Sequence, residues 1–221
     1  KISLFKYLGG SSCNQLPLPL MNVINGGVHA NNNLRIQEFM IRPDSAKNFS
    51  EAIKICFLVI QKLKSILNRI GASTNVGDEG GFAPELGTNE SAIGTIIQAI
   101  NEAGFKEGTD VSICLDVAAN ELFTEEKKYI VNNEKIMSAE KTVDFYLDLI
   151  KKYPIKSIED PFSEDDWSAW KSLMVSFKSF KNNIQIVGDD LFVTNKERLL
   201  KGIEQKAANA ILIKPNQIGT V

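Results

Sequence analysis

The segment SICLDVAAN, residues 112–120, is a short apolar run that ends at an acidic residue, Asp116. The pattern recurs in SIEDPF, where the run ends at Glu159, and in QIVGDDL, where it ends at Asp189. A fourth run, in AILIKPNQ, ends at Lys214. Apolar runs that alternate with helical segments predict an α/β fold with a parallel sheet, whose strands deliver their C-terminal ends to one edge. We therefore expect three carboxylates and one amine to meet at that edge, where (β/α) barrels build their active sites.

The segments between these runs have helical periodicity and recognisable helix ends. Helices are expected at 45–72, 88–103 and 138–153, after a cap at Ser163, and after the capping-box sequence 194–197. Strands are expected at 39–41, 111–115, 157–158, 184–187 and 210–213, and residues 129–131 are expected to form a small hairpin strand outside the main sheet. This order of elements predicts one large α/β domain.

Three converging carboxylates without Cys or His among them are typical of a hard-cation site, and Mg²⁺ is the expected occupant. A single acid at a strand end is more often a helix N-cap or a solvated turn residue, so the prediction depends on the set of three. Asp190, which follows Asp189, is expected to be a supporting or structural acid. Lys214 is then a candidate base beside the cation.

Two glycine-rich segments add further candidates. In NVGDEGGFAP, residues 75–84, glycines flank two adjacent acids, Asp78 and Glu79, as expected where the backbone turns sharply and approaches a ligand. In NGGVHA, residues 25–30, a glycine pair precedes His29, the one histidine of the chain. A histidine after such a pair is by itself more often a turn residue than a catalyst. Neither segment fits a nucleotide-binding glycine motif.

Composition excludes several classes of function. The 221 residues carry 25 basic and 27 acidic side chains, a net charge of −2, which gives no basic face for nucleic acid. The longest apolar stretch, 55–60, is far shorter than the roughly 20 residues that span a bilayer. Cys13, Cys56 and Cys114 form no CxxC pair, so a cytoplasmic location is expected.

Six motifs occur together in one order: LPLPLMNVINGGVHA, QEFMI, GDEGGFAP, SIEDPF with EDDW, VGDDLFVTN and LIKPNQIGT. In this combination, which covers nearly the whole chain, the sequence resembles enolase, the phosphopyruvate hydratase of glycolysis, in a form closer to bacterial enolases than to animal ones. The resemblance implies an enolase-type (β/α)8 TIM barrel. By this resemblance, the chain is expected to form an incomplete barrel of about six strands that lacks the family's N-terminal capping domain and last strands.

The resemblance also implies roles for individual residues. Asp116, Glu159 and Asp189 match the family's metal ligands, the set that the strand-end argument selects independently. Lys214 matches the general base and Glu79 the general acid. The implied reaction is the reversible dehydration of 2-phosphoglycerate to phosphoenolpyruvate with two Mg²⁺ ions per site.

The remaining matched positions concern the substrate. Glu38 matches a supporting carboxylate, and His29 matches a group that closes over the substrate. The residues implied to contact the substrate are His29, Glu38, Glu159, Asp189 and Lys214. Lys214 acts as a base near neutral pH only if nearby cations or desolvation lower its pKa, and the carboxylates of Asp78 and Glu38 are expected to raise the pKa of Glu79.

By the same resemblance, residues 1–15 are expected to be the end of the capping domain or a linker, and residues 16–221 a partial C-terminal catalytic barrel. The 221-residue chain by itself is expected to be inactive, because the family's phosphate-gripping segment and second catalytic lysine lie outside it. The full-length protein is expected to be a homodimer or a larger homo-oligomer. It is expected in the cytoplasm, with a secondary cell-surface or secreted pool.

Two alternatives remain open. One is another enzyme of the same superfamily that acts on a different carboxylate, which racemisation or cycloisomerisation without dehydration of 2-phosphoglycerate would indicate. The other is a non-catalytic scaffold or surface-binding homologue, which an unchanged biological role after Lys214→Ala would indicate. The His29, Glu79 and Lys214 motifs argue against the first, and the intact acids and base argue against the second.

Overall fold

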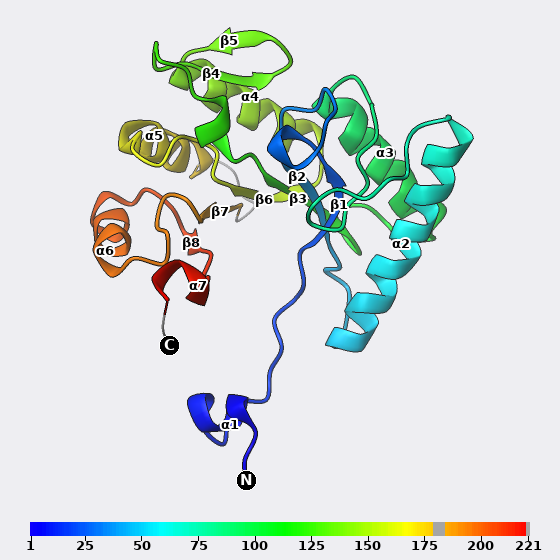
Figure 1. Cartoon of the computed structure of the whole chain (residues 1–221), viewed down its shortest axis with the longest axis horizontal. Coiled ribbons are helices and arrows are strands. Elements are labelled where there is room, and N and C mark those ends of the chain that lie inside the picture. Colours follow the sequence, from blue (N-terminus) through cyan, green and yellow to red (C-terminus); the bar gives the residue numbers. More distant parts are fainter. Residues whose placement is uncertain (179–183, 220–221) are drawn as a thin grey trace.

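The computed structural model describes residues 1–178 and 184–219; residues 179–183 and 220–221, part of the segment expected to form the barrel, lie outside the described residues. Helices follow one another around the outside of a six-stranded sheet (Figure 1). In sheet order the strands are β1 (Met21–Asn25), β2 (Glu38–Arg42), β3 (Ser112–Asp116), β6 (Ile155–Glu159), β7 (Gln185–Gly188) and β8 (Ala210–Ile211). The helices are α1 (Leu4–Gly9), α2 (Phe49–Arg69), α3 (Asn89–Glu102), α4 (Ala139–Lys152), α5 (Trp167–Phe177), α6 (Lys196–Gln205) and α7 (Pro215–Ile218).

The five expected long helices are present as α2 to α6, and their ends follow from local chemistry. Asn48, the N-cap of α2, accepts a hydrogen bond from the backbone N–H of Glu51, and the buried positions of the helix recur at intervals of three and four residues. Just beyond the end of α2, Gly71 has a φ of 72°, a left-handed conformation that glycine adopts without strain.

Two predicted caps differ from the structure by one or a few residues. The N-cap of α5 is Asp166, whose carboxylate accepts from the N–H of Ala169, and not Ser163. The N-cap of α6 is Asn195, while the preceding Thr194 donates its hydroxyl proton to Gln217. In both cases several cap-forming residues stand in a row, and contacts outside the helix decide which of them serves as the cap.

The prediction of a parallel sheet is correct for one part of it and wrong for the other. Strands β3, β6, β7 and β8 are parallel, but β2 is antiparallel to both β1 and β3. Strand β1 was not among the expected strands. The connection from β1 to β2 contains a short 3-10 helix, Gly27–His29, and no longer helix. The first two strands therefore form a hairpin-like pair instead of a β/α unit.

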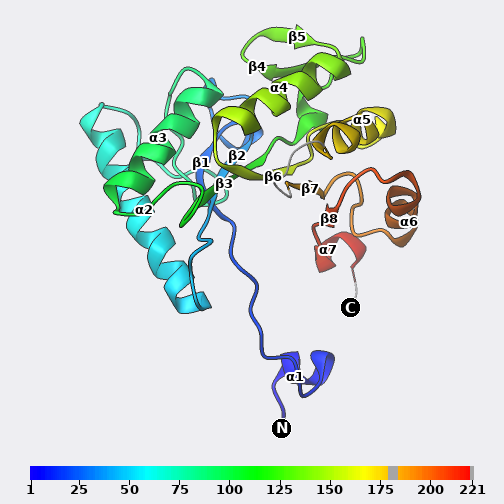
Figure 2. The same cartoon turned by 180° about the vertical axis from the view of Figure 1, so that it is seen from behind.

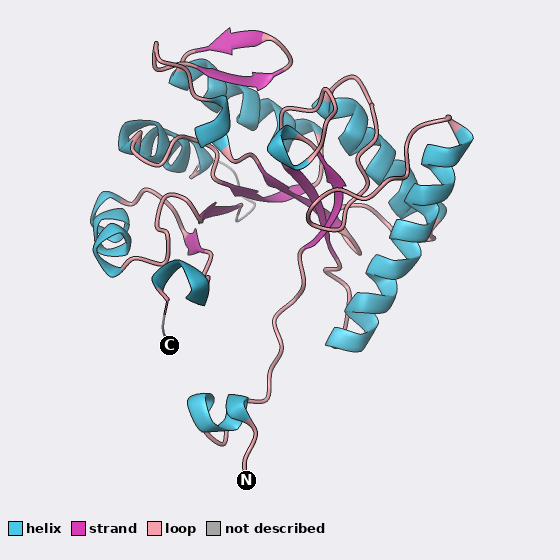
Figure 3. Ribbon diagram, viewed as in Figure 1, coloured by secondary structure: helices cyan, strands magenta, loops and turns pink. Residues whose placement is uncertain are grey.

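The predicted hairpin strand is confirmed. Strand β4 (Tyr129–Asn132) pairs with β5 (Lys135–Met137) in a separate two-stranded sheet, after the 3-10 helix Ala119–Leu122. In Figure 3 this small sheet stands apart from the main one, above α4. It accounts for the long connection between β3 and β6.

One continuous apolar core joins the sheet to its helices, and every residue of β3 is buried. Among the described residues, β1 and β8 are the two end strands of the sheet, and the outer side of β1 carries only an isolated bridge between Ile24 and Phe82. The sheet is therefore open and forms an incomplete barrel. Viewed from behind, α1 lies apart from this body at the end of an extended segment (Figure 2), and none of its residues is buried. No described helix combines the length and apolar character needed to cross a membrane.

Candidate active site

Three of the predicted carboxylates lie side by side at one edge of the sheet. Asp116 and Glu159 are the last residues of β3 and β6 and pair with each other in the parallel register. Glu159 pairs in turn with Val187 of β7, and Asp189 follows that strand directly. All three side chains belong to residues that are at least nine-tenths buried. The strand-end argument thus correctly brings these residues together.

Glu38 reaches the same edge from the opposite chain direction. It is the first residue of β2, and the antiparallel pairing sets it directly beside Asp116. Because the start of an antiparallel strand lies where its parallel neighbours end, Glu38 joins the group of carboxylates. The strand-end pattern missed this residue, since that pattern assumes a single strand direction; the motif QEFMI was the signal that identified it.

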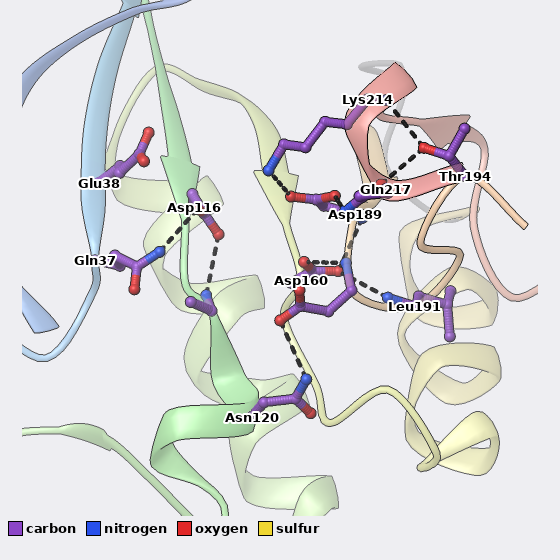
Figure 4. Close-up of polar contacts among 12 residues, drawn as sticks. Gln37, Glu38, Asp116, Asn120, Asp160, Asp189, Leu191, Thr194, Lys214 and Gln217 are labelled. Atoms are coloured by element: carbon purple, nitrogen blue, oxygen red, sulfur yellow. Dashed lines mark hydrogen bonds and ion pairs between the residues drawn. The ribbon is translucent and has the colours of Figure 1, made fainter. Parts of the chain in front are cut away.

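Lys214 lies on the β8 side of the site as the N-cap residue of α7, and its Nζ contacts the carboxylate of Asp189 (Figure 4). Gln217 donates its side-chain N–H to Oδ1 of Asp189 at 2.8 Å. Thr194 links the two, because its Oγ1 accepts from the backbone N–H of Lys214 at 2.9 Å and donates to Gln217 at 2.7 Å. Sequence reasoning missed Gln217 and Thr194, although both lie in motifs that it quoted.

His29 and Glu79 gather around Glu38 at the other end of the site. Nδ1 of His29 is 3.5 Å from Oε1 of Glu38, and ligand atoms of His29, Glu38 and Glu79 all lie within 4.8 Å of one another. The loop that carries Glu79 is held against β1, where Phe82 donates its N–H to the carbonyl of Val23 at 2.9 Å. The predicted residues from the two glycine-rich segments thus meet in space.

Glycine is required where this loop crosses β1. A Cβ on Gly81 would lie 2.9 Å from the backbone nitrogen of Ile24, closer than side chains approach backbone atoms. A Cβ on Gly77 would lie 2.4 Å from the side-chain nitrogen of Asn25, which itself donates to the carbonyl of Gly81. The glycines therefore let the backbone bearing Glu79 lie directly on the strand, whereas the sequence led us to expect them to allow a close approach to a ligand.

A single cavity of about 570 Å³ is lined by every predicted site residue. These residues are His29, Glu38, Glu79, Asp116, Glu159, Asp189 and Lys214. In the order of the sheet, the group around Glu38 lies on the β1–β2 side, Lys214 lies on the β8 side, and the three predicted metal ligands lie between them. The cavity therefore has a possible proton acceptor at one end and acids at the other.

The carboxylates form two overlapping groups with close oxygen atoms. Asp116, Glu159 and Asp160 have ligand atoms within 4.8 Å of one another, and so do Asp160, Asp189 and Asp190. Sequence analysis did not select Asp160, which belongs to both groups; its place directly after Glu159 was the available signal. Asp190 accepts a hydrogen bond from the side chain of Asn120 at 3.1 Å, which agrees with a supporting role.

Burial strongly favours the neutral forms of these acids. It raises the pKa of Glu159 to about 10, with a further contribution from the charge of Asp116. Burial also raises the pKa of Asp116 to about 7 and the pKa of Glu38 to about 9, the latter with a hydrogen bond to Glu79 as the next cause. A divalent cation would compensate such a group of buried negative charges, and oxygen donors are those that Mg²⁺ prefers. The donor set therefore fits Mg²⁺.

Lys214 differs from what a base near neutral pH requires. Burial lowers the pKa of its amine, but the hydrogen bond to Asp189 and the nearby carboxylates outweigh burial, so the pKa is raised. In this arrangement Lys214 is a cation paired with a predicted metal ligand.

The fold and the cavity define a partial (β/α) barrel with a cluster of carboxylates at the strand ends. Comparison with known proteins agrees: residues 13–221 match the family model described as the enolase C-terminal TIM barrel domain. The enolase of Pelagibacter ubique (strain HTCC1062) is 60% identical over 207 residues, which cover 94% of this chain and 48% of that protein. The chain belongs to the enolase family and spans about half the length of this curated relative.

Proposed function

We propose that the protein catalyses the Mg²⁺-dependent, reversible dehydration of 2-phosphoglycerate to phosphoenolpyruvate. The observation that supports this proposal most is the arrangement along the cavity: Lys214 at one end, Glu79 with Glu38 at the other, and Asp116, Glu159 and Asp189 between them. A dehydration needs a base on one side of the substrate and an acid on the other, because a proton leaves one carbon and hydroxide leaves the next.

The chemical difficulty is the low acidity of the proton on carbon 2, which adjoins an ionised carboxylate. Bound Mg²⁺, held by Asp116, Glu159 and Asp189, would offset the extra negative charge on that carboxylate as the proton leaves. The proposal follows the general pattern of enolase-superfamily sites, which combine a Lys or His base with one or two Mg²⁺ ions.

We assign proton removal to Lys214. To accept a proton, its amine must be neutral, and the contact with Asp189 favours the charged form. Lys214 must therefore separate from the Asp189 carboxylate before it acts as a base. The proposal assigns Asp189 to metal binding. A cation bound there would offset the carboxylate charge that keeps the lysine protonated.

We assign proton delivery to Glu79. Glu79 shares a hydrogen bond with Glu38, whose pKa burial raises to about 9, so Glu38 holds a proton beside Glu79 near neutral pH. A retained proton is what the leaving hydroxide requires. His29, 3.5 Å from Glu38, is proposed to cover the substrate beside the pair.

The test uses the protein as its gene encodes it and follows phosphoenolpyruvate formation by its absorbance, with and without Mg²⁺. We expect Mg²⁺-dependent turnover that Lys214→Ala and Glu79→Gln each reduce by at least about 100-fold, the lower end of the range for a positioned acid or base. Lys171→Ala, on the exposed side of α5, is the matched control and should leave turnover unchanged. Full turnover in Glu79→Gln would exclude its role as the acid.

Other outcomes would favour the alternatives. Racemisation or cycloisomerisation of another carboxylate, without dehydration of 2-phosphoglycerate, would favour a different enzyme of the superfamily. A biological role that survives Lys214→Ala would favour a scaffold. We also propose a homo-oligomer in the cytoplasm with a secondary cell-surface or secreted pool; light scattering and cell fractionation test these two statements.

A further inference from the structure

Asp160 makes an unusual set of hydrogen bonds between two strand ends. It is 3% exposed and follows Glu159 at the end of β6. Its Oδ1 accepts from the backbone N–H of Asp189 at 3.1 Å and from that of Leu191 at 3.5 Å, and its Oδ2 accepts from the N–H of Asp190 at 2.8 Å. One carboxylate thus receives three consecutive amides of the loop that begins with a predicted metal ligand (Figure 4).

We propose that Asp160 is a positioning residue that sets the place of the Asp189 carboxylate relative to Glu159, and is not itself a metal ligand. This inference rests on the proposed metal site. Because Asp160 is covalently joined to Glu159 and hydrogen-bonded to the backbone of Asp189, it fixes two predicted ligands from different strands to each other. Its carboxylate oxygens offer about four lone-pair sites, and the three amides occupy three of them, which leaves about one for a cation.

The backbone of Asp160 is held in the conformation that this role needs. Its N–H donates to the carbonyl of Val187 at 3.0 Å, and its carbonyl accepts from the N–H of Ala119 at 3.1 Å. Its φ is 40°, in the left-handed region, which is uncommon for residues other than glycine and is better tolerated by Asp and Asn. This turn directs the side chain back toward the end of β7, so all three neighbouring strand ends contribute to its position.

A second contact stabilises the same loop from the β3 side. The side chain of Asn120 donates to Asp190 at 3.1 Å and to Glu164 at 3.2 Å. In the loop after β7, Asn120 contacts the side chain of Asp190, whereas Asp160 holds the backbone amides next to the predicted ligand. Replacing Asp160 should therefore affect the position of Asp189 more directly than replacing Asp190.

The experiment compares the protein as its gene encodes it with Asp160→Asn and, as the matched control, Asp190→Asn. Both variants replace an acidic side chain near the site with an amide, but Asp190→Asn keeps the side chain that receives the three amides. The first readout is hydrogen exchange of the amides of residues 189–191 in EDTA. The second readout is Mg²⁺ affinity by calorimetry.

We expect Asp160→Asn to speed exchange at residues 189–191 in EDTA and to weaken Mg²⁺ binding by about 10–100-fold, as is typical when a partner of a metal ligand is lost. Asp190→Asn should leave this exchange unchanged and weaken Mg²⁺ binding less. Should Asp160→Asn not fold, Asp160→Glu keeps the charge but displaces the oxygens by one methylene. This variant should show the same two changes to a smaller degree. Wild-type values of both amide exchange and Mg²⁺ affinity would overturn the inference.

Three further results would overturn the inference, and one more would remove its basis. Weaker Mg²⁺ binding with unchanged exchange would make Asp160 a ligand, whereas faster exchange with unchanged Mg²⁺ binding would make its role purely structural. Equal losses of Mg²⁺ affinity in Asp160→Asn and Asp190→Asn would show that the effect comes from the loss of an acidic group near the site and not from the hydrogen bonds to the three amides. If the wild-type protein binds no Mg²⁺, the proposed function fails, and this inference fails with it.

Discussion

At the scale of single residues, the main question is which of the buried acids at this edge of the sheet hold protons. Burial raises the pKa of Asp160 to about 8, besides the raised pKa values of Asp116, Glu38 and Glu159. In an unfolded chain such groups titrate near pH 4. Between pH 4 and the folded pKa values of about 7 to 10, the folded state therefore binds more protons than the unfolded state.

A pH dependence of stability follows from this difference. In EDTA, the free energy of unfolding should fall as the pH rises from 5 toward 10, because stability decreases with pH wherever the folded state binds the extra protons. Urea unfolding at a series of pH values measures it. Glu159→Gln removes the group whose pKa is raised most among these four and should flatten the slope. A free energy of unfolding that rises from pH 5 to 9 in EDTA would contradict the prediction.

A second prediction at this scale concerns the loop that carries Glu79. Gly81→Ala should lower turnover, because its Cβ would lie 2.9 Å from backbone atoms of β1 and push the loop away from the strand. Gly94→Ala is the control: its Cβ, within α3, meets nothing within 4 Å. It should raise stability by about 1 kcal/mol, since alanine favours helix over glycine. The measurements are turnover and urea unfolding, and wild-type turnover in Gly81→Ala would contradict the close contact.

At the scale of elements, one buried amide side chain joins three parts of the structure that are distant in sequence. Asn89, the first residue of α3, is 1% exposed, and its Oδ1 accepts from the N–H groups of Arg35 and Ile36. Its Nδ2 donates to the carbonyl of Val131 in β4 at 2.8 Å. One amide side chain thus joins a helix, the hairpin and the segment that leads from His29 to Glu38.

Asn89→Ala should lower the free energy of unfolding by about 1–3 kcal/mol, because it leaves these buried backbone groups without partners. Asn101→Ala, at the exposed opposite end of the same helix, is the matched control and should change stability by less than about 0.5 kcal/mol. Urea unfolding of both variants makes the comparison. Equal effects of the two substitutions would show that the buried hydrogen bonds of Asn89 contribute nothing specific.

At the scale of the whole molecule, the proposed cation links three strands. Its proposed ligands, Asp116, Glu159 and Asp189, come from the ends of β3, β6 and β7. A ligand that binds the folded state alone stabilises it, by about 2.7 kcal/mol at a concentration 100 times its dissociation constant. Metal binding should therefore appear in global stability as well as in turnover.

Addition of Mg²⁺ to the EDTA-treated protein should raise its thermal unfolding temperature, and excess EDTA should reverse the rise. The effect should be larger at pH 8 than at pH 6, because the ligands must lose protons to bind the cation. Asp116→Asn should remove most of the rise, while Asp148→Asn on the exposed side of α4 should keep it. A rise of equal size in Asp116→Asn would argue against this metal site.

The sequence by itself determined the five long helices α2 to α6, the parallel strands and the meeting of three carboxylates, because apolar periodicity and strand ends are local properties. It did not reveal β1 or the reversed direction of β2, since strand direction depends on pairing between distant segments. Glu38 reached the predicted site only through a motif, because its place at the edge follows from that reversal.

Hydrogen bonds within the site were decided by the tertiary structure alone. The sequence identified Lys214 and Asp189 but not their contact, which raises the pKa of the lysine instead of lowering it. It also passed over Asp160, whose neighbours in the chain give no sign of the three amides that it accepts from the β7 loop. Residue types and periodicity are written in the chain, whereas the partners of a buried side chain are fixed only when strands distant in sequence pack together.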